Sequence, residues 1–401
     1  MCERPIATAG NGPSATVRPA RSASRPLSTT TSSTPGPAPS TSIPSEVTPP
    51  DMSESGLALL ANRHQASLTC PRAVIMTMSD RPDTGFPPAE YEMRLERAQA
   101  LMTEARLDAL FLTSEQHVRY ITGFASQFWT SPTRPWFVVV PRAGRPIAVV
   151  PTIGEAGMAD TWVEDIRTWP APRPDDDGVS LLTTALQDLP RRFGRVGGEF
   201  GQEMVVRMPL NDLLRVRDAV RPLELVDGSE VLRRLRAIKS PAEIAKIRFV
   251  CELTSKAFQA LPEHLTPGMS EWEACREMRL EVLRRGADAS PYMMGQSGPG
   301  GYDNIIMGPG SRRLGEGDIL IIDTGTTFDG YFCDFDRNYA FGQPDDAARR
   351  AYDVAYDATD AGIAACRPGA TTTDLWRAMT ELLEAGGALG NNVGRLGHGL
   401  G

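Results

Sequence analysis

The stretch IIDTGTTFDGYFCDFDR, residues 321–337, decides the fold of the region around it. It reads as two strands, 318–328 and 331–341, joined by a turn at Asp329-Gly330. An Asp-Gly pair between alternating apolar runs is a strong hairpin signal, because both central residues of such a turn take positive φ. The stretch therefore predicts a β-hairpin with a two-residue turn.

The register of this hairpin brings three carboxylates together. Asp323 lies opposite Asp336 and diagonal to Asp334, all on one face. Opposed residues lie roughly 5 Å apart at Cβ and diagonal ones roughly 7–8 Å apart. Carboxylates this close repel one another unless a cation lies between them, so the pattern predicts a site for two metal ions. A solvent-facing hairpin with scattered aspartates is the alternative, but the apolar run 319–322 makes an unpartnered Asp323 costly to bury.

Composition limits the classes of protein. The chain has 401 residues, 41% of them hydrophobic and 23% charged, as in an ordinary soluble globular protein of two or three domains. A formal net charge of −8 shows no electrostatic footprint for nucleic acid, and no apolar run is long enough to suggest a membrane segment. Six scattered cysteines without a CxxC pair indicate reduced thiols, and we expect a cytoplasmic location.

Residues 1–78 are expected to form a disordered head outside the fold. Ser, Thr, Pro and Ala dominate it, so it offers little apolar surface to offset the entropy of ordering. It lacks the apolar core of a secretory signal and is faintly like an organelle transit peptide. A start site placed too far upstream, with the true start at Met76 or Met78, explains it equally well.

An α/β domain is predicted over residues 88–228. A helical period runs through 90–105, and a buried strand follows at 109–113. Alternation of strands and helices after that strand favours a layered α/β domain, and no Gly-rich phosphate loop follows any strand. The further elements expected are a hairpin of 136–140 with 147–150, helices near 181–192 and 205–220, and strands at 196–200 and 223–226.

A linker over 229–240 leads into a second domain at 241–401. The linker helix carries basic residues that we interpret as a solvated face. Ser240 at the N-cap, a proline at the first helical position and Glu243 at the third form a capping box that begins a long helix. Within this domain 265–287 resembles 366–388, which suggests two similar halves around a shared cleft.

Four histidines occur in the chain. His64 lies in the head, and His264 is expected at the surface. His117 is placed in a polar loop after the first strand, where a structural role and a substrate-lining role are both open. His398 lies in LGHGLG, where flanking glycines let the backbone approach a site closely. Together with the hairpin aspartates it becomes a candidate metal ligand.

These motifs resemble the pita-bread metallohydrolases, which include prolidases, Xaa-Pro aminopeptidases, methionine aminopeptidases and creatinases. The similar segments, which span about 88–401, are GEGDILIIDTG with the following DGYFCDFDR, the linker RRLRAIKSPAEIAKIR, the terminal HGLG, and SEQHVRYITGF of the first domain. The resemblance implies an α/β creatinase-type N-terminal domain and an α+β pita-bread catalytic domain. It implies that Asp323, Asp334 and His398 bind two divalent ions (manganese, cobalt or zinc), with Asp334 bridging them.

The resemblance also assigns supporting roles. We expect Asp336 and Arg337 next to the metal ligands, and His117 and Tyr120 at the substrate. The family's peptidases carry a cleft histidine about twelve residues before the aspartate of the GD pair, Asp318, where this chain has Ile306 or Met307. Asp336 stands where Thr or Ser is usual.

Two glutamate ligands of the family follow the histidine, and the printed chain ends at Gly401. We therefore expect the chain to be a C-terminally truncated and inactive fragment, with its general-base glutamate beyond Gly401.

Three functions fit the pattern. The first is a dinuclear metal hydrolase of the Xaa-Pro aminopeptidase type, which removes an N-terminal residue or dipeptide from small peptides. The second is a non-peptidase enzyme of the same fold, either a creatinase- or ectoine-hydrolase-like C–N hydrolase acting on a small amide or an osmolyte lyase. The third is a metal-free pita-bread domain that binds protein. We expect a homodimer without nucleic-acid or membrane partners.

Overall fold

The structure is a computed structural model that describes residues 81–388 and 394–400. The predicted head at 1–78 lies outside the described residues. None of the described helices is both long and apolar enough to cross a membrane. Four of the cysteines are described, and all four are free thiols: Cys251, Cys275, Cys333 and Cys366.

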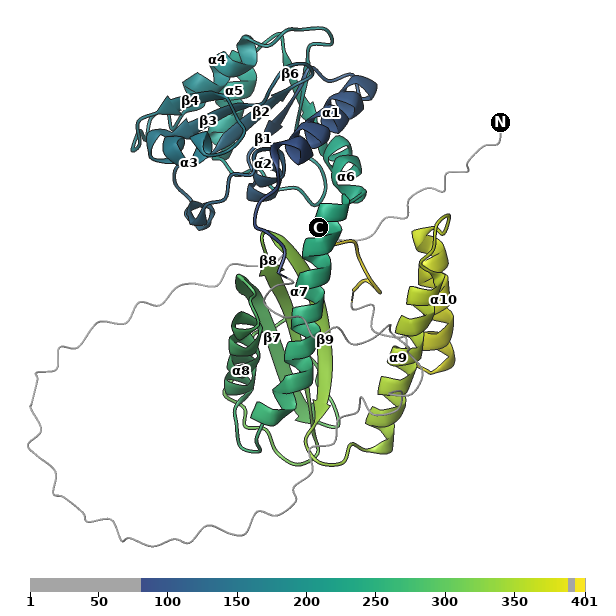
Figure 1. Ribbon diagram of the computed structural model, residues 1–401. Coiled ribbons are helices and arrows are strands. Elements are labelled where there is room, and N and C mark those ends of the chain that lie inside the picture. The colour runs from purple at the N-terminus through teal and green to yellow at the C-terminus, as the bar shows by residue number, and fades with distance from the viewer. Residues whose placement is uncertain (1–80, 389–393, 401) are drawn as a thin grey trace, which may run out of the picture. The chain divides into compact units, whose positions relative to one another are not determined.

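The amino-terminal part of the described chain is built on a six-stranded mixed sheet (Figure 1). Its strand order is β4-β3-β2-β1-β5-β6, and the central β1 pairs antiparallel with β2 and parallel with β5. The strands are β1 (Ala109–Leu112), β2 (Phe137–Pro141), β3 (Ile147–Pro151), β4 (Asp165–Trp169), β5 (Arg195–Gly198) and β6 (Glu224–Asp227).

Helices bury both faces of this sheet. Leu110 and Leu112 point into a core with α1 (Pro88–Glu104), α2 (Glu115–Thr122) and α6 (Ser229–Ala237). Ala109 and Phe111 point the other way, into a core with α4 (Val179–Gln187) and α5 (Leu210–Ala219). Burial on both faces explains why β1 to β3 read as continuous apolar runs. The predicted linker helix, α6, contributes Val231, Leu232 and Leu235 to the first core.

The predicted elements of this part lie at or near the observed ones, but one helix begins later than expected, and neither α2 nor β4 was expected. The helix expected at 205–220 begins only at Leu210, because Pro209 occupies its N-cap. Strand β4 was not expected, since DIRTW is half exposed and lacks the apolar run of its neighbours. The short α3 (Glu155–Ala159) leads into it.

The second part contains a three-stranded antiparallel sheet of β7 (Ala289–Pro299), β8 (Asp318–Phe328) and β9 (Tyr331–Ala340). Helices α7 (Pro241–Ala260) and α8 (Glu271–Arg284) pack on one face of it (Figure 1). Leu320, Ile322 and Cys333 point toward these helices and form the core with them. Because side chains alternate along a strand, Asp323 and Asp334 lie on the opposite face.

The hairpin prediction is confirmed in its turn and in its register. Asp329 and Gly330 have φ of 49° and 82°, the pair of positive values that a two-residue turn of this kind requires. Asp323 pairs with Asp336, and Phe328 pairs with Tyr331 at the turn.

The internal similarity corresponds to two helix–turn–helix units. In the first, α7 leads to Gly268 and α8; in the second, α9 (Asp346–Ala365) leads to Gly369 and α10 (Thr372–Ala385). Both glycines have φ of 89°, a conformation that side chains rarely adopt. A capping box starts three of the helices, at Ser240, Ser270 and Thr371, and the first of these confirms the prediction.

Candidate metal centre

Three aspartates of β8 and β9 share the sheet face that α7 and α8 leave uncovered. Asp323 is opposite Asp336, and Asp334 is opposite Gly325, two residues along β8. The geometry is the one that alternation along both strands dictates, with Asp334 diagonal to Asp323. Two neighbouring strands thus hold three carboxylates within reach of one another.

Burial and mutual repulsion raise the pKa of two of these carboxylates, Asp323 and Asp336. The pKa of Asp323 rises to about 6, first because burial disfavours its charge and then because Asp334 and Asp336 repel it, while His398 acts in the opposite sense. Burial and Asp334 also raise the pKa of Asp336, against the lowering effect of Arg337. The cluster therefore carries negative charge that the neighbouring side chains do not balance.

Asp334 has a partner on each of its two oxygens. The His398 Nε2 lies 2.9 Å from Asp334 Oδ2. The Tyr292 hydroxyl of β7 donates a hydrogen bond to Asp334 Oδ1. The ring of Tyr292 lies flat over Gly325, where any Cβ would overlap it. A glycine at 325 is thus needed for the tyrosine to reach the aspartate.

These side chains supply the donor types of a manganese, cobalt or zinc site, namely carboxylate oxygens and one imidazole. Asp334 lies diagonal to Asp323 on the sheet and contacts His398. The raised pKa of Asp323 indicates negative charge that a cation would balance. Within residues 81–388 and 394–400, however, no three His, Cys, Asp or Glu side chains converge closely enough to hold an ion. The donor chemistry fits divalent metals, although the ligands do not converge in this conformation.

Arg337 does not reach the carboxylates through its guanidinium. Its Nη1 donates to the backbone oxygen of Asp336 at 2.5 Å, and its guanidinium lies over the rings of Phe258 and Phe335. It influences the site through its charge, which lowers the pKa of Asp336.

The expectation that His117 lies in a loop is wrong, because it lies in α2 and is buried. Its Nδ1 is 2.5 Å from Glu199 Oε1 and 3.0 Å from Ser114 Oγ, while its Nε2 is 3.1 Å from Arg236 Nη1. Glu199 follows β5, and its carboxylate also accepts from the backbone N–H of Thr113 and Ser114. His117 therefore belongs to a network that fixes the start of α2.

Tyr120 is also buried. Its ring lies under the guanidinium of Arg94, and its hydroxyl is 3.4 Å from the Leu235 carbonyl oxygen. Burial raises the pKa of Tyr120 to about 12. Of the other histidines, His264 lies partly exposed in the short 3₁₀ helix Leu261–His264, and His64 lies outside the described residues.

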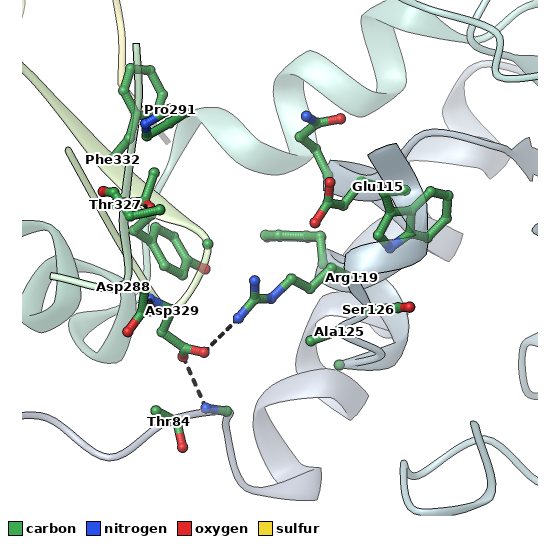
Figure 2. A pocket seen from close by; sticks show the side chains of 18 of the residues that line it. Thr84, Glu115, Arg119, Ala125, Ser126, Asp288, Pro291, Thr327, Asp329 and Phe332 are labelled. Atoms are coloured by element: carbon green, nitrogen blue, oxygen red, sulfur yellow. Dashed lines mark hydrogen bonds and ion pairs between the residues drawn. The ribbon is translucent and has the colours of Figure 1, made fainter. Parts of the chain in front are cut away.

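A cleft of about 920 Å³ reaches Gly325, the residue opposite Asp334 in the sheet. The sheet contributes Tyr292, Gly325, Thr327 and Phe332 to its lining, and α2 contributes Glu115, Gln116, Arg119 and Tyr120. In Figure 2, Phe332 and Thr327 line one side, while Glu115 and Arg119 line the other. Of these eight residues, only Tyr120 was expected from the sequence to lie at the substrate.

The hairpin turn ends the cleft with a network of charged groups. Asp329 forms an ion pair with Lys246 of α7, and Arg119 Nη2 lies 2.6 Å from Asp329 Oδ1. The backbone N–H of Gly85 donates to Asp329 Oδ2 at 2.9 Å. Beside it, Arg94 Nη2 and the Tyr331 hydroxyl are 3.2 Å apart, and that hydroxyl donates to Glu243 Oε1 at 2.9 Å. These contacts were not expected, because they join residues far apart in the sequence.

Comparison with known proteins agrees with this architecture. The Creatinase/Prolidase N-terminal domain matches residues 94–238, and metallopeptidase family M24 matches residues 245–401. The probable dipeptidase PepE of Mycobacterium tuberculosis is 28% identical over 313 residues, which are 78% of this chain and 80% of that protein. The Xaa-Pro dipeptidase of Pyrococcus furiosus is 23% identical over 309 residues, which are 77% of this chain and 82% of that protein.

A solved structure resembles the whole described region. Dipeptidase PepE from Mycobacterium ulcerans matches with a TM-score of 0.67 and 29% identity, covering 79% of this chain and 82% of that one. The predicted combination of an α/β domain with a pita-bread domain is thus confirmed. The chain belongs to metallopeptidase family M24, the pita-bread family, and carries a creatinase/prolidase-type domain before its catalytic domain.

Proposed function

We propose that this protein is a dinuclear metal-dependent peptidase that cleaves the bond between an N-terminal residue and a following proline. The observation that carries the proposal is the group of Asp323, Asp334 and His398 beside the cleft. Membership of a metallopeptidase family and the peptidase names of its relatives support this reading over a non-peptidase enzyme or a metal-free binding domain. The dipeptidase names also suggest short substrates.

Each ligand has a distinct proposed role. Asp334 contacts His398 through one oxygen and Tyr292 through the other, and it would help to hold both ions. Asp323 would bind one ion and His398 the other, while Tyr292 orients Asp334. Divalent ions, when bound, lower the pKa of a coordinated water and polarise the scissile carbonyl.

The remaining groups shape the site. Asp336 adds negative charge opposite Asp323, which favours dications over monovalent ions. Ile306 and Met307, which stand where family peptidases carry a cleft histidine, are 74% and 54% exposed. A substrate contact made by that histidine would have to come from another side chain.

The test is hydrolysis of Ala-Pro and Ala-Ala by the full-length protein, before and after metal removal. We expect cleavage of Ala-Pro in preference to Ala-Ala, loss of cleavage in chelator, and recovery on adding manganese, cobalt or zinc. Cleavage that continues at the same rate in excess chelator would exclude a metal mechanism. Equal rates for the two peptides would exclude the proline preference but leave a metal-dependent peptidase.

A further inference from the structure

We propose that the cleft beside the hairpin binds the carboxyl-side portion of peptides of four residues, with an apolar side chain two or three residues after the scissile bond. The inference rests on the proposed function. It extends that function to peptides of four residues, which are longer than the dipeptides that the names of the relatives indicate. It identifies Phe332 as a specificity-determining residue.

The cleft and the candidate metal ligands share one surface of the sheet. Gly325 and Thr327 follow Asp323 at alternate positions of β8, and Phe332 precedes Asp334 by two on β9. Side chains at alternate positions point to the same face of a sheet. All three residues line the cleft, so it continues directly from the ligands toward the hairpin turn.

This surface is long enough for several residues of an extended peptide. A strand rises about 3.3 Å per residue, so the four residues from Asp334 to Gly330 span about 13 Å. Gly330 still lines the cleft. An extended peptide has a similar rise, so this distance fits three to four substrate residues. A dipeptide would leave most of it unfilled.

The cleft receives the part of the substrate on the carboxyl side of the scissile bond. An enzyme that removes one N-terminal residue has room for about one residue on the amino side of the scissile bond. A channel several residues long next to the ligands must therefore receive the carboxyl side. Both the continuity of the surface and its length then assign it to the peptide that leaves after cleavage.

The walls of the cleft are aromatic near Asp334 and polar further away. The rings of Tyr292 and Phe332 line the sheet side nearest Asp334, and Trp129 lies on the other side. Aromatic walls of this kind bury apolar side chains. Further out, Arg119 is 27% exposed and faces the cleft beside Glu115, and both present polar groups suited to a peptide backbone (Figure 2).

Phe332 is only partly buried, so its truncation leaves the core of the sheet intact. Phe128 offers a matched control, because it is 43% exposed in the neighbouring 3₁₀ helix Gln127–Thr130 and does not line the cleft. Phe332→Ala and Phe128→Ala remove the same side chain, and Phe128 is the more exposed of the two. Only the first removes a cleft wall.

The experiment compares kcat/KM for Ala-Pro and Ala-Pro-Phe-Phe in the wild type and both variants. We expect the tetrapeptide to exceed the dipeptide about tenfold in the wild type, a ratio typical of one well-filled apolar contact. Phe332→Ala should bring the ratio close to one, and Phe128→Ala should preserve it. A wild-type enzyme that cleaves Ala-Pro as well as or better than the tetrapeptide would overturn the inference while the proposed function stands.

A binding measurement separates the cleft from catalysis. Pro-Phe-Phe, the expected carboxyl-side product, is titrated by calorimetry into the protein in chelator. We expect saturable binding that Phe332→Ala weakens about tenfold and Phe128→Ala does not change. Binding no tighter than that of proline alone would overturn the inference, even if every peptide tested proved inactive as a substrate.

Discussion

The aspartates of the β8–β9 hairpin have opposite electrostatic environments at its ends and in its middle. At its ends, Asp318 and Asp329 are paired with cations. In its middle, Asp323, Asp334 and Asp336 face one another, and the only ion pair that these three make with the described residues is that of Asp334 with His398. The same residue type therefore stabilises the fold in one place and carries unbalanced charge a few residues away.

The paired ends are satisfied electrostatically. Arg312 donates to both oxygens of Asp318 at 2.7 Å, and this hydrogen bonding lowers the pKa of Asp318. Asp329 binds Lys246 and Arg119 together. In the middle, burial and repulsion raise the pKa of Asp323 to about 6. Groups with perturbed pKa values and no structural partner gather at functional sites, which marks the middle of the hairpin as the site.

The largest expected effect concerns the buried pair at the turn. Lys246 and Asp329 are both almost fully buried, so Lys246→Met leaves a buried carboxylate without that cation. Breaking a buried pair destabilises a protein by about 3–5 kcal/mol, and we expect the lower end of this range because Arg119 still pairs with Asp329. Urea denaturation at neutral pH measures the loss. The control is Arg234→Met, which breaks an exposed pair with Glu104 and should lower stability far less, because solvent screens exposed ion pairs. Equal losses in the two variants would remove the distinction between ends and surface.

A smaller effect is expected at the start of the hairpin. Asp318→Asn removes a charged partner of Arg312, which is itself partly exposed, and should cost about 1–2 kcal/mol at pH 7. Because the folded pKa of Asp318 is lowered, its contribution is present above its ordinary pKa and is lost as the pH falls below about 4. Urea denaturation at pH 7 and pH 3.5 should show the gap between wild type and variant closing. A gap that does not depend on pH would show that the pair acts through shape alone.

The smallest effect has the opposite sign. The folded pKa of Asp323 is raised, so the metal-free protein binds more protons than its unfolded chain between about pH 4 and 6 and loses stability as the pH rises through that window. Asp323→Asn removes this penalty. In chelator the variant should therefore be more stable than the wild type by about 1 kcal/mol at pH 7, with the difference vanishing near pH 4. A variant less stable than the wild type at pH 7 would contradict the repulsion in the cluster.

The hairpin could be predicted from the sequence because its signals are local. The Asp-Gly turn and the apolar runs beside it determine the pairing, and the pairing determines which aspartates meet. The capping box at Ser240 is equally local, since Glu243 lies three residues away. The internal similarity was visible for the same reason, because each copy carries its own Pro-Gly turn.

What escaped prediction depends on distant partners. Strand β7 contains Gly295, Gly298 and two prolines and shows no clear alternation, so its pairing with β8 is what makes it a strand. His117 meets Glu199 across 82 positions of sequence, and Lys246 meets Asp329 across 83. No periodicity or turn chemistry reports such contacts. The cleft lining was missed on the same grounds, because strands and a helix from separate parts of the chain build it.

The most direct test of the central claim is calorimetric titration of manganese, cobalt and zinc into metal-free protein. Wild type, Asp323→Asn, Asp334→Asn and Asp318→Asn are compared, the last as a hairpin carboxylate outside the site. We expect divalent metal to bind the wild type and Asp318→Asn, and tight binding to be lost in the other two variants. Wild-type affinity and stoichiometry in Asp334→Asn would show that the aspartates in the middle of this hairpin are not metal ligands.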